Sequence, residues 1–580
     1  MSDLLNRLEQ LSPEKRELLN LLMKQESGGR QTTYMAPRTP AEETLAAIWS
    51  QVLGVDRVGI YDNFLALGGD SIQSIQIVAK AHKAGLQLNT NQLFEHPTIA
   101  ELATEANTTA TPQVELEPVA GFVPLTPIQH WFFEQNFLKP HHWNQSILLA
   151  VQPGQDPTQI EIIFQHLLRQ HDALRLRFEQ QDRIWRQMSE PSVEPGWFST
   201  WNLSSLEEKG QASAIASIAT DLQASLNLSQ GCLLKVAYFD LGALQPGRLL
   251  IIVHHLAVEA VVSFRILMED IQTAYQQLSR GDTICLPPKT TSFQQWANQL
   301  DDYAQSSELQ QELAYWLADA QSQPAQLPVD HPNGANTEAS TRIVTVSLTS
   351  AETDVLLRTV PSVFHTQIHE VLLTGLAQSI AEWTGTRTVL IDLDSHGRED
   401  ILEGVDISRT VGWFTALFPV RLHLGTTQTA VEALPLVKQQ VRSIPKRGIG
   451  YGLLRYGCLD QAIGQKLRER PQAEIMFNYL GQFDQILPQS SPFQFAPESC
   501  GPLYNPDGHR THCLQVLSRV FGGQLQVSWL YSEHLHQQAT VERVAFDCMK
   551  ALRSILDSCR SSTGDREAYQ ETRVQVEEEL

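Results

Sequence analysis

The sequence predicts an α + α/β chain, in which a helical N-terminal region precedes a larger α/β region with room for two lobes. Leucines recur at helical spacing near the N-terminus. Between residues 122 and 560, short apolar runs typical of buried strands alternate with helical segments. The length of 580 residues exceeds that of one ordinary domain, so we expect three or four hydrophobic cores.

The composition is typical of a globular protein and excludes several functional classes. The hydrophobic fraction is 42% and the charged fraction 19%. A net charge of −22 argues against a nucleic-acid partner, because nucleic-acid binders carry basic patches. We expect no contact with a membrane, since no apolar run of about 18 residues and no signal-peptide core occur. The seven cysteines are scattered without a CxxC pair, which disfavours zinc and disulfides and fits a reducing cytoplasm.

The chain is predicted to contain two folded regions and four terminal or connecting segments. The N-terminal segment has leucines at helical spacing and offers a packing or docking face. The two linkers lack apolar periodicity. The acidic C-terminal tail is either solvated or a docking segment. The predicted boundaries are 1–25 (N-terminal helices), 26–39 (linker), 40–105 (first folded region), 106–121 (linker), 122–560 (second folded region) and 561–580 (tail).

Within the second folded region, the apolar pattern distinguishes strands from helices. Three short runs predict buried strands at 147–151, 249–253 and 388–392. Longer periodic segments predict helices at 264–278 and 368–383. The mixture predicts an α/β region rather than a helical bundle.

Residues 68–72, Gly-Gly-Asp-Ser-Ile, form the most informative stretch of the sequence. A serine that follows a glycine turn at a helix start is expected to be exposed, with its hydroxyl pointing outward. In isolation, the letters Gly-Gly-Asp-Ser favour a different interpretation, a serine that only caps a helix. The surrounding residues decide between these interpretations: Pro37–Pro40 precedes the stretch, Glu42–Trp49 opens a helix, and Phe94–Ile99 precedes a last one.

Along their whole length, residues 35–105 resemble a peptidyl carrier domain of the nonribosomal peptide synthetases. The resemblance implies a four-helix bundle in which Ser71 carries a covalent 4'-phosphopantetheine arm. A phosphopantetheinyl transferase is then a partner, and thioester-bound amino acids or peptides are the cargo. In that family, an Asp before the serine, here Asp70, is usual where the carrier feeds an epimerization domain.

Two adjacent histidines, His254 and His255, follow the strand run 249–253 directly. At a strand end, one side chain is expected to enter the core and the other to face a cleft. A buried structural pair and a catalytic base are both open at this point. Metal binding is less favoured, because no third ligand lies at usable spacing.

Residues 254–260 resemble the HHxxxDG motif of condensation and epimerization domains, with Glu259 and Ala260 at the family's Asp and Gly positions. Other blocks follow in the family's order and imply a two-lobed fold like that of chloramphenicol acetyltransferase. The block at the Asn-Tyr pair resembles the epimerization subtype. The blocks are Pro124–Phe133, His171–Phe178, Lys289–Trp296, Asp392–Glu399, Arg409–Thr415, Gly448–Gly452 and Phe477–Asp484.

The resemblance implies a two-base site for removal and return of an α-proton. His255 matches the catalytic histidine, and Asp394 stands where the family has a Glu as second acid/base. Taken alone, Asp394 is also compatible with a carboxylate that caps a loop. The remaining implied site residues are Tyr479 and Asn478 as donors to the enolate, with His254, Glu259 and Arg398 in support.

Two acid/base groups must flank the reacting carbon, each within about 2.6–3.2 Å of the proton it handles. Imidazole titrates near neutrality, and burial can raise the pKa of a carboxyl into the same range. Asp is one methylene shorter than Glu, which retracts the Asp394 oxygens by about 1.5 Å. A displacement of about 1 Å can lower a rate about 100-fold.

The sequence therefore predicts an epimerase, an isomerase that converts a carrier-bound aminoacyl or peptidyl thioester from L to D. Its expected partners are other synthetase subunits: upstream adenylation or condensation modules and a downstream condensation domain. The altered residues Glu259, Ala260 and Asp394 also favour an alternative, a catalytically impaired platform that recruits partner enzymes to the carrier. Peptide-bond formation shares the implied fold but fits Asn478 and Tyr479 poorly.

Overall fold

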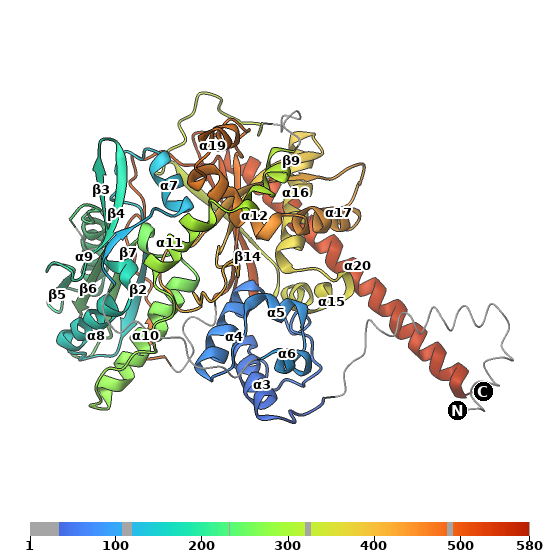
Figure 1. The fold of residues 1–580 in the computed structure, drawn as a ribbon, viewed down its shortest axis with the longest axis horizontal. Helices are drawn as coiled ribbons and strands as arrows, with labels where there is room; N and C mark the ends of the chain where they lie inside the picture. The colour runs from blue at the N-terminus through green and yellow to red at the C-terminus, as the bar shows by residue number, and fades with distance from the viewer. Residues whose placement is uncertain (1–33, 107–118, 231–232, 319–325, 484–490, 579–580) are drawn as a thin grey trace.

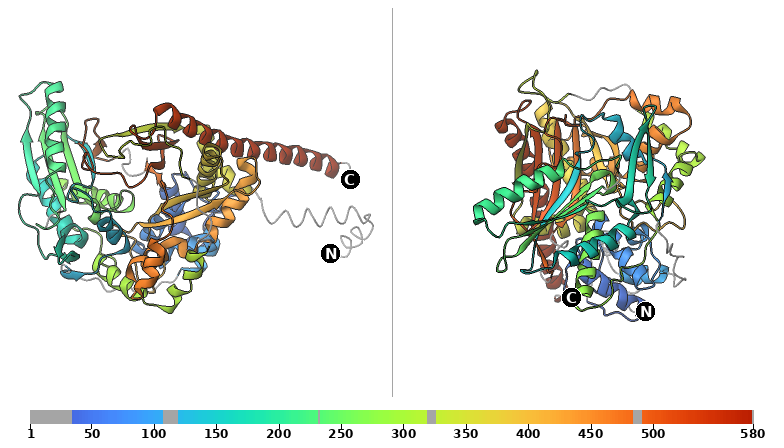
Figure 2. Two further views of the ribbon diagram at one scale, coloured as in Figure 1. Left: turned by 90° about the horizontal axis from the view of Figure 1, so that it is seen from above. Right: turned by 90° about the vertical axis from the view of Figure 1, so that its left-hand side faces the viewer.

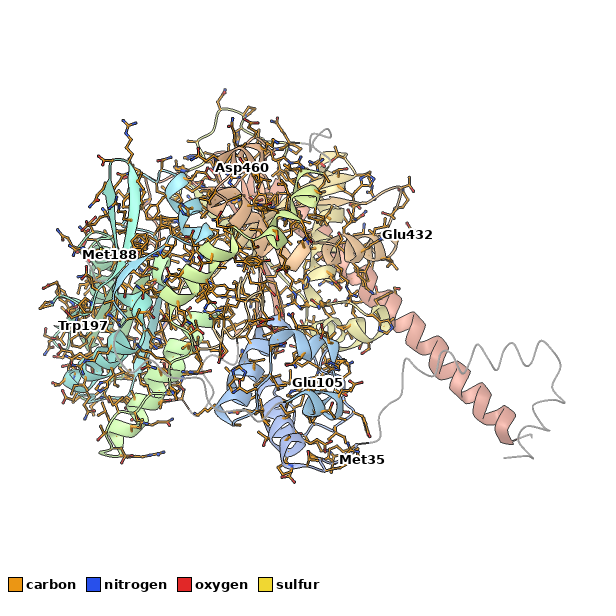
Figure 3. The ribbon with its side chains drawn as sticks, viewed as in Figure 1. Met35, Glu105, Met188, Trp197, Glu432 and Asp460 are labelled. Atoms are coloured by element: carbon orange, nitrogen blue, oxygen red, sulfur yellow. The ribbon has the colours of Figure 1, made fainter. Side chains whose placement is uncertain are left out.

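The structure, a computed structural model, describes residues 34–106, 119–230, 233–318, 326–483 and 491–578, with side chains as far as residue 559. The predicted N-terminal helices at 1–25 lie outside the described residues, as do most residues of the two predicted linkers. In Figure 3, labelled side chains mark the three parts of the molecule: Met35 and Glu105 the N-terminal helical domain, Met188 and Trp197 the first lobe, Glu432 and Asp460 the second.

Residues 34–106 form a bundle of four helices around one small core. Trp49 and Phe64 are fully buried at its centre, with their rings 5.4 Å apart. Thr39 caps the first helix in a capping box with Glu42, and Pro40 occupies the first helical position. The helices are α3 (Pro40–Leu53), α4 (Ser71–Lys83), α5 (Thr90–Glu95) and α6 (Ile99–Glu105).

The glycine turn before α4 requires both of its glycines. Gly68 has a φ of +91°, in the left-handed region that favours glycine. A Cβ on Gly69 would lie 2.3 Å from a ring carbon of Phe64, so no larger residue fits there. The turn therefore packs tightly onto the bundle core and fixes where α4 begins.

The first lobe is built on a five-stranded sheet with strand order β12-β2-β7-β6-β5. Central strand β7 is buried on both faces: Leu249 and Ile251 join the core beneath α8 and α10, whereas Leu250 and Ile252 pack under α9. This explains its unbroken apolar run. A three-stranded sheet, β1-β4-β3, completes the lobe (Figure 1). The bounds are β1 (Gly121–Val123), β2 (Asn144–Val151), α8 (Pro157–Gln170), β3 (Leu176–Gln181), β4 (Ile184–Ser189), β5 (Phe198–Asn202), α9 (Glu208–Gln223), β6 (Leu234–Asp240), β7 (Gly247–His254), α10 (Val262–Ser279) and β12 (Phe493–Phe495).

The second lobe is built on a six-stranded sheet with strand order β10-β9-β11-β13-β14-β8. Helix α16 packs between α17 and α20, and the three contact strands of this sheet. Strands β9 and β11 run parallel, so their carboxyl ends lie at the same edge. The bounds are β8 (Thr341–Ser347), α16 (Ile368–Thr384), β9 (Thr388–Ser395), β10 (Ala416–His423), α17 (Ala430–Arg442), β11 (Ile475–Gln482), β13 (Leu514–Phe521), β14 (Gln524–Ser532) and α20 (Gln538–Glu578).

Shorter helices connect these elements along the chain, and the far end of α20 extends beyond the body of the molecule (Figure 2). Within the described ranges, no helix combines the length and apolar character needed to cross a membrane. The connecting helices are α7 (Pro127–Glu134), η2 (Asp172–Arg175), η3 (His255–Ala257), α11 (Phe293–Tyr303), α12 (Ser307–Gln310), α13 (Leu313–Leu317), α14 (Ser350–Asp354), η4 (Val355–Thr359), α15 (Val360–Phe364), η5 (Pro445–Gly448), α18 (Ile449–Gly452), η6 (Leu453–Gly457) and α19 (Gln461–Arg468).

The predicted α + α/β fold class is confirmed. Each of the three predicted strands lies inside an observed strand, and the predicted helices 264–278 and 368–383 lie inside α10 and α16. The boundary predicted at residue 560 does not coincide with the end of an element, because α20 continues through the acidic tail to Glu578.

Candidate active site

His254, at the end of β7, is a structural residue of the first lobe. Its side chain is fully buried, and Nε2–H donates to the Pro140 carbonyl at 2.8 Å. The Leu256 amide donates to Nδ1 at 3.1 Å. Burial lowers the pKa of His254 to about 3, so both ring nitrogens keep these neutral-state hydrogen bonds.

His255 takes the other direction that strand alternation predicts and lies between two indole rings. The ring of Trp143 stacks on it at 4.8 Å, and the ring of Trp413 contacts it at 4.5 Å. Burial lowers the pKa of His255 to about 4, which leaves the imidazole unprotonated at neutral pH. Among the described residues, none hydrogen-bonds its Nδ1. A neutral imidazole whose Nδ1 has no hydrogen-bond partner among the described residues is available as a base.

Asp394 lies on β9 of the second lobe, beside the neighbouring strand β11. The register pairs Leu393 with Phe477, which brings Asp394 next to Asn478. Burial raises the pKa of Asp394 to about 7, although hydrogen bonds to Asn478 and Thr415 oppose the rise. The carboxyl is therefore half-protonated near neutral pH, which an ordinary surface Asp is not.

Glu259 and Arg398 form a buried ion pair that joins the histidine loop to the second lobe. Arg398 Nη2 lies 2.7 Å from Glu259 Oε1, and the guanidinium also donates to the carbonyls of Ile407 and Thr410. Ser263 Oγ donates to Glu259 Oε2 at 2.7 Å. Glu259, at the position of the family's Asp, thus pairs with Arg398, the other residue that the resemblance implied in a supporting role.

Contacts across the lobe boundary connect His255 with Asp394. Trp413 touches the imidazole, and Thr415, two residues later, hydrogen-bonds Asp394. The charge of Glu259, four residues after His255, also contributes to the raised pKa of Asp394. A base with a lowered pKa and an acid with a raised pKa therefore share one region between the lobes.

The structure separates the two residues expected to stabilise an enolate. Asn478 bonds Asp394, but the Tyr479 hydroxyl donates to Asp70 of the carrier at 3.4 Å. Successive side chains on a strand point to opposite faces, so the two cannot serve the same atom from β11. Tyr479 thus lies at the carrier contact rather than beside Asp394.

Ser71 occupies the first turn of α4, and Asp70 rather than Ser71 caps the helix. The Asp70 carboxylate accepts from the amides of Ile72 at 3.0 Å and Gln73 at 2.8 Å. Interpreting Ser71 as a capping serine is therefore wrong. Ser71 is half-buried rather than exposed, because the second lobe packs beside it.

Several further contacts hold the carrier against the second lobe at the carboxyl ends of β9 and β11. Asp400 accepts from the Thr90 amide at 2.8 Å and from its hydroxyl at 2.5 Å. His82 Nδ1 lies 2.7 Å from Asp406 Oδ2. The Gln482 amide donates to the Gly68 carbonyl at 3.3 Å. These contacts place the turn that precedes Ser71 against the second lobe.

Removing the Asp400 side chain is expected to loosen this contact. In Asp400→Ala, the amides of Thr90 and Asn91 lose their partner, and a lost cap of about 1 kcal/mol corresponds to about fivefold. Hydrogen exchange of those two amides in the full chain should accelerate by about that factor. Glu403→Ala, an exposed position on the same loop, is the matched control. Unchanged protection in Asp400→Ala would show that the contact does not hold the carrier.

Sequence reasoning missed the residues that complete the site from a distance. Trp413 and Thr415 lay in a block that was identified, but nothing in the block distinguished them. Trp143, Asp400 and Asp406 had no signal, because their partners are far away in the sequence. No group of three metal-ligating side chains occurs in the described part of the chain.

A bundle that presents a serine at a helix start, joined to two lobes of the chloramphenicol acetyltransferase type, defines a carrier protein fused to a condensation-like domain. The family model for the condensation domain matches residues 119–575, and that for the phosphopantetheine attachment site matches residues 43–105. The chain belongs to the condensation-domain family, preceded by a carrier domain.

The similar proteins are components of nonribosomal peptide synthetases. One of the linear gramicidin synthase proteins of Brevibacillus parabrevis is 47% identical over 524 residues, which is 90% of this chain and 7% of that protein. Tyrocidine synthase 1 of the same organism is 36% identical over 539 residues, 91% of this chain and 49% of that protein. The chain thus spans less than half the length of either relative.

Among solved structures, the epimerization domain from the third module of tyrocidine synthetase B superposes with a TM-score of 0.72 at 35% identity. The match covers 78% of this chain and 99% of that one. The X-domain from teicoplanin biosynthesis superposes with a TM-score of 0.59 at 16% identity, covering 77% of this chain and 97% of that one, which shows a shared fold.

The carrier domain takes covalent 4'-phosphopantetheine, and the residues around Ser71 fit that group. Asp70 supplies the helix cap, so modification of the Ser71 hydroxyl removes no capping hydrogen bond. A Cβ on Gly481 would lie 2.8 Å from Ile72, so glycine lets the second lobe approach closely beside Ser71. When attached, the arm would supply the thiol that holds an acyl cargo as a thioester.

Proposed function

We propose that this didomain epimerizes the α-carbon of an aminoacyl or peptidyl thioester carried on Ser71. The observation that carries the proposal is the pair of groups with opposite pKa shifts, His255 from one lobe and Asp394 from the other. Titratable groups whose environments push their pKa values apart are typical of acid/base pairs in enzymes. The likeness to an epimerization domain supports the same function.

In this mechanism, neutral His255 removes the α-proton from one face of the substrate. The C–H electron pair stays on the substrate as an enolate, for which the Asn478 amide is the nearby donor. Protonated Asp394 then delivers its proton to the opposite face, and a new C–H bond forms. His255 ends protonated and Asp394 ionised, and proton exchange with solvent restores both.

The direct test is uptake of deuterium at the α-carbon from heavy water, on full-length protein loaded with aminoacyl or peptidyl groups. The reactive state needs neutral His255 and protonated Asp394. Below pH about 4, His255 is protonated, and above pH about 7, Asp394 is ionised. The rate of exchange is therefore expected to show a bell-shaped dependence on pH, with apparent pKa values near 4 and 7. Above the higher value, the rate should fall about tenfold per pH unit.

The recruitment platform is the second candidate, favoured by the departures at Glu259, Ala260 and Asp394. Asp394→Glu distinguishes the two. If the short carboxylate limits the rate, the extra methylene should raise exchange, by at most about 100-fold. Absence of exchange in wild type and Asp394→Glu alike, on several correctly loaded substrates, would favour the platform.

Other synthetase modules and a phosphopantetheinyl transferase follow as partners from the homologous synthetases and the carrier domain. We propose that upstream adenylation or condensation modules load Ser71, and that a downstream condensation domain accepts the inverted product. The cytoplasm is the proposed location, in line with the scattered cysteines.

A further inference from the structure

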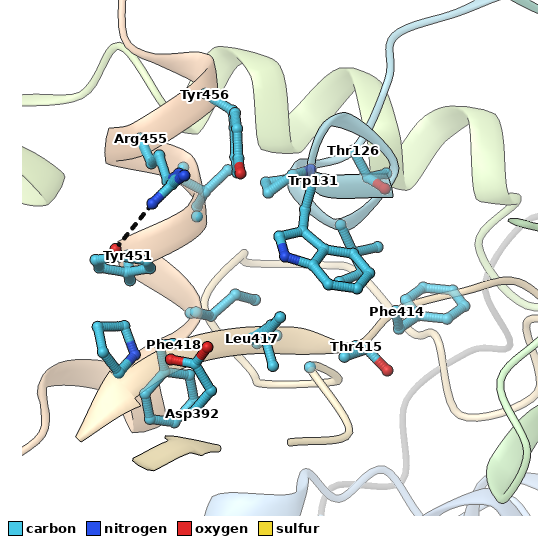
Figure 4. Close-up of a pocket in the computed structure, with 18 of the residues that line it drawn as sticks. Thr126, Trp131, Asp392, Phe414, Thr415, Leu417, Phe418, Tyr451, Arg455 and Tyr456 are labelled. Carbon is cyan, nitrogen blue, oxygen red and sulfur yellow. Dashed lines mark hydrogen bonds between the residues drawn. The ribbon is translucent and has the colours of Figure 1, made fainter. Parts of the chain in front are cut away.

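The contact between the carrier and the second lobe has a chemical feature that the proposed reaction does not explain. The cavity between the two lobes, with Trp131 and Thr415 in its wall, belongs to the site already described (Figure 4). The carrier instead lies against the loop that follows β9, residues 396–409. There, Asp406 of the loop contacts His82 of α4.

Both ring nitrogens of His82 face an oxygen atom. Nδ1 lies 2.7 Å from Asp406 Oδ2, and Nε2 lies 2.6 Å from the carbonyl oxygen of Leu88. A carboxylate and a carbonyl oxygen accept hydrogen bonds but cannot donate them. Each short contact therefore needs a proton on its own ring nitrogen, and only the imidazolium carries both protons.

Either neutral tautomer of His82 leaves one of these contacts without a proton. With the proton on Nε2, the lone pair of Nδ1 faces the Asp406 carboxylate. With the proton on Nδ1, the lone pair of Nε2 faces the Leu88 carbonyl, where the Leu88 amide, at 3.3 Å, is a longer and weaker donor. The Leu88 contact lies within the carrier and does not depend on docking, whereas Asp406 belongs to the lobe.

Asp406 is held in position by its own lobe. Its Oδ1 accepts from the Ser408 amide at 2.9 Å. Its backbone amide donates to Thr291 Oγ1 at 3.0 Å, and its carbonyl accepts from the Thr291 amide at 2.8 Å. The side chains of His82 and Asp406 are 17% and 20% exposed, so salt and water screen the pair only in part. The lobe thus presents a fixed carboxylate to the carrier.

The negative charges of the second lobe favour the protonated ring. Burial opposes the protonation of His82, but the hydrogen bond and charge of Asp406, the Leu88 carbonyl and the charge of Asp400 outweigh it, so the pKa of His82 is raised. Burial likewise opposes ionisation of Asp406, but its hydrogen bond and ion pair with His82 lower the pKa of that carboxyl. Each partner therefore stabilises the charged form of the other.

The neighbouring cations have other surroundings. Arg409, on the same loop, pairs with Glu269 and Asp270 of α10 at 2.8 and 2.5 Å. Lys80, on α4, interacts with Glu269 as well. Lys83, the last residue of α4, is exposed, so water and salt screen its charge. The carboxylate that faces the imidazole is therefore left to the imidazole.

From this geometry we infer that the second lobe binds the carrier with His82 protonated, so that docking takes up a proton and the His82–Asp406 pair is a pH-dependent docking contact. Away from Asp406, the ordinary pKa of histidine is about 6.5. The contribution of the pair is fully present below that value and is lost as the pH rises through the higher pKa of the docked state. On the acid side it is lost below pH about 4, as Asp406 becomes protonated.

The first test measures hydrogen exchange of the Thr90 and Asn91 amides in the full-length chain from pH about 5.5 to about 8.5. Both amides donate to Asp400 across the contact, so their protection reports docking. Dividing the rate in His82→Gln by the wild-type rate at the same pH cancels the intrinsic pH dependence of amide exchange. The ratio should be about tenfold at the acidic end and fall toward one at the alkaline end, because the charged hydrogen bond exists only while His82 is protonated.

A control variant removes a different positive charge from the same helix. Lys83→Gln leaves the His82–Asp406 contact intact, and Lys83 is exposed. Its exchange ratio for the same two amides should stay near one at every pH.

The second test exchanges the acceptor for a group that can also donate. In Asp406→Asn, the side-chain oxygen can still accept from the Ser408 amide, while the amide nitrogen can donate to Nδ1 of the neutral ring. Docking should then be firmer above pH about 6.5 than below it, the reverse of wild type. Glu403→Gln, an exposed position on the same loop, is the matched control and should keep the wild-type dependence.

A third measurement follows the ring itself by NMR on full-length protein with labelled histidine, where the His82 signal is assigned by its absence in His82→Gln. The ring should titrate at higher pH in wild type than in Asp406→Asn. Equal titration in the two chains, or an exchange ratio for His82→Gln that does not vary with pH, would overturn the inference. Neither outcome bears on epimerization, because amide protection and ring titration are measured without turnover.

Discussion

Ser71→Ala is expected to abolish both attachment of the phosphopantetheine arm and all α-proton exchange. The arm forms a bond to the Ser71 oxygen, and alanine has no atom to replace it. After treatment with a phosphopantetheinyl transferase, the intact mass of wild type should rise by one arm, and that of Ser71→Ala should not rise. The loss is complete rather than graded, because the substrate is no longer tethered.

The fold should tolerate this change, which makes the result interpretable. Asp70 caps α4 and is unaffected, and alanine is favourable in the first turn of a helix. The melting temperature should therefore change little. Ser74→Ala is the matched control on the same helix, since Ser74 is buried and its hydroxyl bonds the Ser71 carbonyl at 2.7 Å. A mass increase that persists in Ser71→Ala would place the arm elsewhere.

His255→Ala is expected to reduce α-deuterium uptake by about 100- to 10,000-fold, the usual contribution of a positioned general base. The imidazole is neutral at pH 7 and none of the described residues hydrogen-bonds its Nδ1, so its removal costs the fold the ring contacts with Trp143 and Trp413 but no hydrogen bond at that nitrogen. The measurement is exchange on loaded protein, with the melting temperature followed in parallel.

The neighbouring histidine provides the contrasting variant. His254 is fully buried and holds two backbone hydrogen bonds, so His254→Ala should lower the melting temperature as well as activity. His255→Ala should lose exchange with a smaller fall in melting temperature, because it removes ring contacts but neither of those two hydrogen bonds. If exchange survives in His255→Ala on a folded chain, His255 is not the base.

Local sequence patterns were enough to predict several strands and helices of the fold. The run at 249–253 predicted a buried strand because β7 is covered on both faces, which removes the polar positions that an edge strand would show. The glycine pair before Ser71 predicted a helix start for an equally local reason, since only glycine fits against Phe64 and at a φ of +91°.

The candidate site was predictable only in part. The histidine pair follows a strand, so alternation alone assigned one ring to the core and one to a cleft. The same alternation places Asn478 and Tyr479 on opposite faces of β11, which the expectation that both donate to the enolate did not take into account, and it gives no indication of which of them faces Asp394. That choice depends on the register of β11 against β9 and on where the carrier packs.

By itself, the sequence predicted three of the strands, two of the long helices and the helix start at Ser71, and its resemblance to a known family pointed to Ser71, His255 and Asp394 as site residues. Only the tertiary structure decided what these residues meet. Asp400 caps a helix of the carrier 310 residues away, and Tyr479 bonds Asp70 across 409 residues. Periodicity reports which side of its own element a residue faces. It holds no information on which surface a second lobe or a tethered domain brings there, and burial between them sets the pKa of each group.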